Sequence, residues 1–118
     1  MALEAELYDI EQGFWLDGKE HFLNHVDAQC LLAFPQAGEM HGVHSREEVA
    51  ATATDANRWR DLRMGNRQFL NGGDDFAIIS YRADVTRADG EPYAALISSA
   101  YVRRPDGWKL ALHQHSPI

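Results

Sequence analysis

The hydrophobic positions of this chain change their spacing between its two halves. Over residues 2–16 the large side chains recur every three or four positions, which predicts an amphipathic helix. Two neighbouring stripes of that helix hold Leu3, Leu7, Ile10 and Phe14, and Glu4, Tyr8, Glu11 and Trp15. From residue 76 onward apolar and polar residues alternate instead, as they do in strands. The pattern therefore predicts helices first and a sheet afterwards.

The stretch between these two parts predicts shorter elements. Ser45 followed by Glu48 is the capping-box pattern, so we expect a helix that begins at Ser45 and runs to about Ala56. Pro35 ends a short apolar strand, because proline has no backbone N–H to donate. The other expected elements are a short helix over 19–26, strands over 27–34 and 39–43 with a turn at 36–38 between them, an extended stretch over 59–70 and a turn at 71–75.

The last third of the chain predicts a three-strand meander. Strands over 76–85, 93–103 and 108–116 are separated by "RADGE" and "RPDGW", and Asp-Gly between strand-like runs is a strong hairpin signal. Helices followed by such a meander indicate an α+β fold, with helices packed on one face of a curved antiparallel sheet. The length of 118 residues predicts that 1–118 form a single domain.

The two hairpins decide which side chains share a face of this sheet. In the first we expect a two-residue turn at Asp89–Gly90, which sets Tyr81 opposite Ser98. A three-residue loop there would bring Arg82 and Asp84 toward the core, where unpaired charges are costly. In the second we expect a three-residue loop over 105–107. It gives the pairs Arg104–Trp108, Val102–Leu110, Ala100–Leu112 and Ser98–Gln114.

These registers predict an interior face and an outer face. The interior face has the composition of a pocket lining, apolar with a few polar members. It collects Ile79, Tyr81, Ala83, Leu96, Ser98, Ala100, Val102, Leu110, Leu112 and Gln114. We assign the outer face to contact with a second copy of the chain, with Arg82, Tyr101, His113 and His115 as its marker residues.

The charge of the chain narrows its partners. The formal net charge is −7, which argues against a nucleic-acid partner. Residues 1–57 hold 11 acids and 2 bases, whereas residues 58–118 hold 7 acids and 9 bases. No apolar run is long enough to cross a membrane, and the acidic N-terminus lacks the basic start of a secretion signal. With Cys30 as its one cysteine, we expect a cytoplasmic protein with an inert buried thiol.

The two histidines near the C-terminus are the first candidates for chemistry. His113 and His115 lie one residue apart on a strand and so share a face. A metal would need a further ligand, and although His21, His25, His41 and His44 are available, no pair sits in a metal-binding motif. We therefore expect no metal site and place both histidines on the dimer face.

The polar residues of the first helix and of the interior face are the second candidates. Glu11 either reaches into a pocket, where burial would raise its pKa and make it a usable base, or lies on a solvated flank. Tyr81, Ser98 and Gln114 either orient a ligand oxygen or satisfy one another's hydrogen bonds. Beside them, Tyr8 and the wall residues Trp15, Phe34, Trp59 and Met64 either line a pocket or fill the core.

The order of several short motifs resembles a known superfamily. These motifs are Glu11 with Phe14–Trp15, Phe34–Pro35, Arg58–Trp59, Ser80–Tyr81–Arg82–Ala83, Ser98–Ser99–Ala100–Tyr101, and Trp108 with His113–Gln114. Together they resemble the nuclear transport factor 2-like superfamily, and within it the SnoaL-like proteins. The resemblance implies a cone-shaped α+β half-barrel, a homodimer formed through the sheet, and a pocket between the concave sheet and the helices.

The resemblance leaves the activity open, because this superfamily contains enzymes as well as association domains. Its ketosteroid isomerases carry a general-base aspartate shortly before a proline, where this chain has Phe34, and a phenyl ring accepts no proton. We expect a domain that binds a small, largely apolar molecule and, if it is an enzyme, transfers protons as a lyase, isomerase or cyclase. Glu11 would be the base, and no cofactor is required for that chemistry. The alternative is a non-catalytic dimerisation or association module.

Overall fold

The helices and strands follow the predicted order. The computed structural model describes residues 2–34, 41–55 and 58–118. The helices are α1 (Ala2–Leu16), α2 (Lys19–His25) and α3 (Arg46–Ala50). The strands are β1 (Val26–Ala33), β2 (His41–Ser45), β3 (Arg60–Asn71), β4 (Phe76–Thr86), β5 (Pro92–Arg104) and β6 (Gly107–Pro117). None of the described helices is long and apolar enough to cross a membrane.

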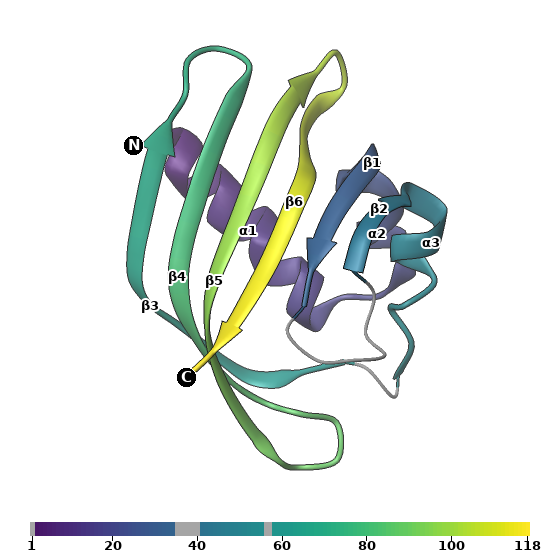
Figure 1. Ribbon diagram of the computed structural model, residues 1–118, viewed down its shortest axis with the longest axis vertical. Coiled ribbons are helices and arrows are strands. Elements are labelled where there is room, and N and C mark those ends of the chain that lie inside the picture. Colours follow the sequence, from purple (N-terminus) through teal and green to yellow (C-terminus); the bar gives the residue numbers. More distant parts are fainter. Residues whose placement is uncertain (1, 35–40, 56–57) are drawn as a thin grey trace.

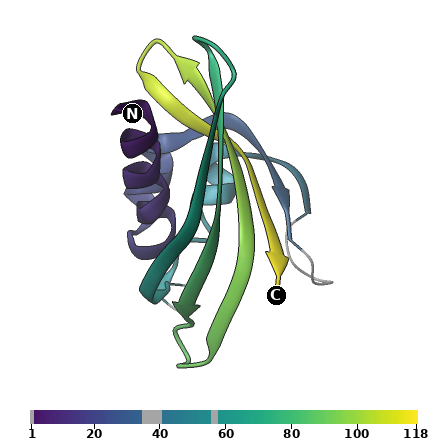
Figure 2. The ribbon, with the colours of Figure 1, turned by 90° about the vertical axis from the view of Figure 1, so that its left-hand side faces the viewer.

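The strands form one curved sheet in the order β2-β1-β6-β5-β4-β3 (Figure 1). The helix α1 lies against one face of this sheet, and the opposite face of the long strands is turned away from it (Figure 2). The α+β prediction is therefore confirmed. One detail differs: β1 and β6 run parallel, so the sheet is mixed instead of purely antiparallel. The parallel pair joins the short N-terminal hairpin of β1 and β2 to the long C-terminal meander.

Helix α1 packs on the sheet through the sector between its two predicted stripes. Leu7 and Phe14 of the first stripe are buried, and so are Tyr8, Glu11 and Trp15 of the second. The helix is therefore rolled further toward its second stripe than the apolar pattern alone indicates. This roll carries a glutamate into the interior.

Two elements in the N-terminal half differ from the predictions by more than one residue. The capping box is present, since Ser45 Oγ accepts from the backbone N–H of Glu48 at 3.1 Å and Glu48 Oε1 accepts from that of Ser45 at 2.9 Å. The helix ends at Ala50, however, well before Ala56. The second short strand covers His41–Ser45 instead of 39–43. The expected turn at 36–38 and the start of that strand at residue 39 lie outside the described residues.

The predicted register of the first hairpin is wrong by one residue. The backbone N–H of Arg87 donates to the carbonyl of Glu91 at 2.8 Å, and Gly90 between them has a φ of +92°. The loop thus has three residues, and its left-handed position is occupied by glycine, which adopts it without strain. Tyr81 consequently pairs with Ile97 and not with Ser98.

The second hairpin contains two deviations that cancel. Arg104 pairs with Gly107 across a two-residue turn, so the predicted pairs Arg104–Trp108 and Val102–Leu110 are wrong. A bulge then adds one residue to β6 between Leu110 and Leu112, and restores the predicted pairs Ala100–Leu112 and Ser98–Gln114. The first hairpin's error remains, so β5 and the end of β6 present their other face to the core.

Candidate functional site

A buried carboxylate lies where α1 crosses the sheet. Glu11 is 0% exposed. Its Oε2 accepts hydrogen bonds from Tyr81 Oη at 2.7 Å and Ser99 Oγ at 2.6 Å, and its Oε1 accepts from Tyr101 Oη at 2.5 Å. Tyr81 Oη in turn accepts from the indole N–H of Trp15 at 2.8 Å. Strands β4 and β5 supply all three hydroxyl donors because they run beneath this turn of the helix.

The surroundings of Glu11 favour its neutral form. Burial raises the pKa of this carboxyl, and the three hydroxyl donors oppose that rise only in part. Burial also raises the pKa values of Tyr81 and Tyr101 well above the ordinary value, and the nearby carboxylate adds to the effect. Glu11 is thus a proton acceptor of raised basicity, held by groups that do not themselves ionise near neutral pH.

A chain of hydrogen bonds leads from the buried Glu11 to partly exposed side chains. Ser99 Oγ lies 2.8 Å from His113 Nδ1, and His113 Nε2 lies 2.9 Å from His115 Nε2. His115 Nδ1 lies 3.0 Å from the hydroxyl of Tyr93. Both Tyr93 and His115 are half-buried, so the chain joins a fully buried group to partly exposed ones.

Counting donors and acceptors gives this chain a direction. When Glu11 is ionised, Ser99 donates its single proton to it, so His113 Nδ1 carries a proton and donates to Ser99. A neutral imidazole has one N–H, so His113 Nε2 accepts from the Nε2–H of His115. His115 Nδ1 then accepts from the hydroxyl of Tyr93. Burial lowers the pKa of His113 to about 4 and that of His115 to about 2, which keeps both rings neutral as this scheme requires.

Aromatic rings surround the outer end of the chain. The His115 ring stacks on Trp15 with centroids 5.2 Å apart and meets the edge of Phe34 at 4.8 Å. Trp59 lies 5.1 Å from Trp15 and 5.3 Å from Tyr93. We call Trp15, Phe34, Trp59, Tyr93 and His115 the aromatic cluster. Phe34, Trp59, Tyr93 and His115 are half-buried, so part of the cluster faces solvent.

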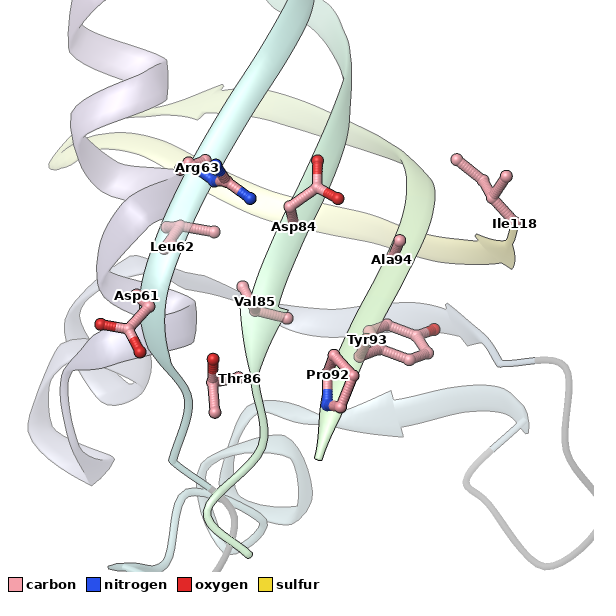
Figure 3. A pocket seen from close by; sticks show the side chains of 10 residues that line it. All are labelled: Asp61, Leu62, Arg63, Asp84, Val85, Thr86, Pro92, Tyr93, Ala94 and Ile118. Carbon is pink, nitrogen blue, oxygen red and sulfur yellow. The ribbon is translucent and has the colours of Figure 1, made fainter. Parts of the chain in front are cut away.

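A groove lies over the start of β3, the end of β4 and the start of β5 (Figure 3). Its volume is about 740 Å³. Its lining is Asp61, Leu62, Arg63, Asp84, Val85, Thr86, Pro92, Tyr93, Ala94 and Ile118. Tyr93 is the one residue of this lining that also belongs to the aromatic cluster.

Comparison with known proteins identifies the architecture. No protein-family model matches the chain, and no curated protein is significantly similar to it. Solved structures do match over nearly the whole chain. A nuclear transport factor 2-like protein of unknown function in nutrient uptake from Rhodospirillum rubrum shares 16% identity at a TM-score of 0.78, covering 97% of both chains. A nuclear transport factor 2-like protein from Cytophaga hutchinsonii shares 13% identity at 0.76, also covering 97% of both.

The chain has the nuclear transport factor 2-like fold. The resemblance drawn from the sequence motifs is confirmed at this level. A third match, from Xanthomonas campestris, is described as a candidate calcium/calmodulin dependent protein kinase II association domain. It shares 18% identity at a TM-score of 0.73, covering 97% of this chain and 84% of that one. These identities establish the fold and leave the activity to be argued from the side chains.

Within this nuclear transport factor 2-like fold, several predicted site residues lie on the opposite face from the one expected. His113 and His115 point toward α1 and Tyr101 is 0% exposed, so their assignment to an outer dimer face is wrong. Ser98 and Gln114 pair on the outer face, so their assignment to the interior is also wrong. The three-residue first hairpin is the cause, since it exchanges the faces of β5 and of the strand paired with it.

Other predicted residues lie where the pattern put them. Tyr81 is buried beside Glu11, whereas Arg82 lies on the outer face in an ion pair with Asp84 at 3.0 Å. Trp15, Phe34 and Trp59 come together in the aromatic cluster.

Two residues of the predicted pocket instead serve the framework of this fold. Tyr8 donates to the backbone carbonyls of Gln68 and Ser80 at 2.8 and 3.0 Å. Met64 is half-buried against the hydrophobic core.

Two members of the hydrogen-bond chain, Ser99 and Tyr93, are not among the site residues predicted from the sequence. Ser99 and Tyr93 gave no signal of their own, because the pattern does not separate Ser98 from Ser99 until the register is known. Across residues 2–34, 41–55 and 58–118 no three histidine, cysteine, aspartate or glutamate side chains converge as metal ligands.

Proposed function

We propose that this domain binds a small, largely apolar organic molecule at the aromatic cluster and exchanges a proton with it. The observation that supports this most is the continuous hydrogen-bond chain from half-buried His115 to fully buried Glu11. Structural histidines need only local partners. Here two neutral rings and a serine line up with every donor directed at one carboxylate.

The chain of hydrogen bonds from His115 to Glu11 explains how a weakly basic histidine would act as a base. Burial lowers the pKa of His115, so an imidazolium formed there alone would be unfavourable. In the proposed step the hydroxyl oxygen of Tyr93 takes a proton from the ligand and gives its own proton to His115 Nδ1, while the Nε2 proton of His115 passes to His113 Nε2. The Nδ1 proton of His113 then moves to Ser99, and the Ser99 proton moves to Glu11. Both rings stay neutral, and the negative charge passes from Glu11 to the ligand.

In this proposal Glu11 remains the base expected from the sequence, but it acts at a distance. It is 0% exposed and its oxygens already accept three hydrogen bonds, so a ligand would meet the outer end of the hydrogen-bond chain, at Tyr93 and His115, and not the carboxylate. Proton removal of this kind serves isomerases, lyases and cyclases, and the ring cluster would hold the apolar part of the substrate.

A carbon-acid probe tests the proposal. Acetophenone is small and largely apolar, and the exchange of its methyl protons for deuterium can be followed by proton NMR. We expect the wild-type protein to accelerate this exchange, and Glu11→Gln and His115→Gln to remove at least about 100-fold of the acceleration. Glu6→Gln, on the exposed side of the same helix, is the matched control and keeps the wild-type rate. Full acceleration by Glu11→Gln would contradict the relay.

The direction of the hydrogen bonds between Tyr93 and Glu11 can be tested without a substrate. Nitrogen-15 NMR of labelled histidine distinguishes the two neutral tautomers. We expect His113 to carry its proton on Nδ1 and His115 on Nε2. Any other pair of tautomers, or an imidazolium at neutral pH, would rule out the directed chain.

A second candidate function, the association module, has its own supporting observation. The strand registers line up one apolar row across all six strands on the outer face: Leu70, Ile78, Ala100, Leu112, Leu31 and Val43. Leu70, Leu31 and Val43 are 58%, 40% and 62% exposed. Such a row is costly to leave in water. We propose that it forms the homodimer contact, with Arg82 on the same face.

Sedimentation separates the two functions. Leu31→Glu should convert the dimer to monomer, whereas Leu23→Glu on α2, with a similar exposure of 38%, should leave it intact. A wild-type monomer at micromolar concentration would contradict the dimer. A dimer without any accelerated exchange would favour the association module over the enzyme.

A further inference from the structure

One cation lies directly over the aromatic cluster. The guanidinium carbon of Arg87 lies 5.1 Å from the ring centre of Trp59 and 4.6 Å from that of Tyr93. Arg87 is the last residue before the three-residue turn, and its backbone N–H is fixed by the carbonyl of Glu91 at 2.8 Å. The side chain is half-buried, so the turn and the two rings hold the charge at the edge of the proposed binding site.

This cation has no carboxylate partner in the described part of the chain. The ion pairs of those residues use the acids Asp17, Glu48, Asp84, Asp27, Asp106 and Glu11, and none of them involves Arg87. The acids of the turn itself, Asp89 and Glu91, are exposed, and Asp89 accepts from the backbone N–H of Glu91 at 3.0 Å. A guanidinium that stacks through its face still presents its N–H groups along its edge.

We infer that the ligand of this site is an anion: a small carboxylic acid with an aromatic or other flat apolar body, whose carboxylate is bound by Arg87. This inference rests on the proposed function and names its substrate class. The body of the ligand would lie on the rings of Trp59 and Phe34. The fork of N–H donors matches the two oxygens of a carboxylate.

The position of the charge also fits the proposed proton transfer. His115 shares the cluster with Tyr93, whose hydroxyl donates to it at 3.0 Å. A ligand held by its carboxylate at Arg87 would therefore place the neighbouring carbon near His115. When the relay moves negative charge from Glu11 to the ligand, the fixed cation stabilises that charge.

A pair of probes of equal shape tests the inference. Phenylacetate and phenylacetamide differ in charge and share the same ring. Binding can be followed through the indole N–H signals of Trp15 and Trp59 in NMR spectra of the full chain, with Trp108 as internal reference. We expect the carboxylate to bind roughly tenfold more tightly than the amide. The difference should shrink in about 0.5 M salt, because screening weakens exposed charge pairs.

Two variants decide which residue carries the preference. Arg87→Gln should bring the carboxylate down to the affinity of the amide and leave the amide unchanged. Arg67→Gln is the matched control, because Arg67 also stacks on a tyrosine, 4.8 Å from the ring of Tyr8, two helical turns from Trp15 along α1. It should keep the full preference.

The outcomes separate this inference from the proposed function. Equal binding of both probes by the wild type, or a preference that survives Arg87→Gln, overturns the anion site and leaves the small-molecule site standing. Binding of neither probe at tens of millimolar overturns both. A preference lost only in Arg87→Gln supports the anion site.

Discussion

Two carboxylates of this protein are shielded from water in opposite ways. Asp27 at the start of β1 is 9% exposed and binds the guanidinium of Arg104 through two hydrogen bonds, at 2.9 and 2.8 Å. Glu11 is 0% exposed and is held by three hydroxyl groups. The cationic partner lowers the pKa of Asp27, whereas burial without such a partner raises the pKa of Glu11.

The opposite pKa shifts of Asp27 and Glu11 suit the two acids to different roles. A carboxylate paired with arginine stays ionised and fixes the chain locally. A carboxylate buried among neutral donors has a raised pKa and binds a proton more strongly than an exposed one, and groups with shifted pKa values concentrate at functional sites. Among the described residues, His113 is the titratable base that lies beside Glu11, with its Nδ1 3.5 Å from Oε2. Burial lowers the pKa of His113 and so keeps its ring neutral.

Removal of the Glu11 carboxylate should have the largest effect on stability. Glu11→Ala leaves three buried hydroxyl groups without their acceptor, so we expect the free energy of unfolding to fall by about 3–5 kcal/mol. Urea denaturation measures the loss. Glu6→Ala on the exposed side of α1 should change the stability by less than about 0.5 kcal/mol. A loss as small as that at Glu11 would show that the hydroxyl cluster is satisfied without its carboxylate.

The second largest effect should be the loss of stability at acid pH that the two neutral histidines, His113 and His115, cause. Both have folded pKa values below the ordinary 6.5, so between pH 6.5 and about 4 the unfolded chain binds protons that the folded chain does not. Stability therefore falls as the pH drops through this window. Glu11 acts in the opposite sense, because its raised pKa favours the folded state as the pH falls toward 4.5.

A histidine variant isolates that contribution. His115→Gln should reduce the stability lost between pH 7 and pH 4.5 by about 2 kcal/mol, measured by urea denaturation at each pH. His41→Gln on β2, where the side chain is exposed, is the control for removal of one histidine. An unchanged acid slope in His115→Gln would mean that the ring is already open to water.

A smaller change sharpens the role of the hydroxyl groups. Tyr101→Phe removes the donor to Glu11 Oε1 and should cost about 1–2 kcal/mol. Because this hydroxyl holds down the pKa of Glu11, its loss should raise that pKa further, which carbon-13 NMR of the carboxyl group would detect. Tyr8→Phe loses a hydroxyl bonded only to backbone carbonyls and should leave the Glu11 titration in place.

The smallest effect is expected at Asp27. Asp27→Asn keeps the shape of the pair with Arg104 and removes its charge, and Arg104 is half exposed, so solvent already screens the pair. We expect a destabilisation well below that of Glu11→Ala. Because the folded pKa of Asp27 is lowered, its contribution is present above pH 3.8 and is lost as the pH falls below that value. A loss equal to that of Glu11→Ala would remove the distinction between the two acids.

The helices, the strands and the residue types of the site can be predicted from the amino-acid sequence. Helical spacing predicts α1, a serine three residues before a glutamate predicts the capping box of α3, and alternation predicts the three long strands of the meander. The sequence also predicts that Trp15, Phe34 and Trp59 belong to one wall of aromatic side chains. These features depend on neighbours within a few positions, which is the range that a sequence pattern covers.

The face of β5 and β6 that points inward depends on contacts between distant parts of the chain. One extra residue in the turn before Pro92 brings Ser99, not Ser98, to Glu11, and turns His113 and His115 toward Trp15. A strand alternates its faces every residue, so a one-residue shift reverses the side of every side chain at once. The expectation that a three-residue loop turns Arg82 and Asp84 toward the core is wrong, because β5 changes its inward face and β4 keeps its own, with Arg82 and Asp84 paired on the outer face. Only the packing of α1 across the strands, with three hydroxyl donors beneath it, identifies the register that satisfies the buried glutamate.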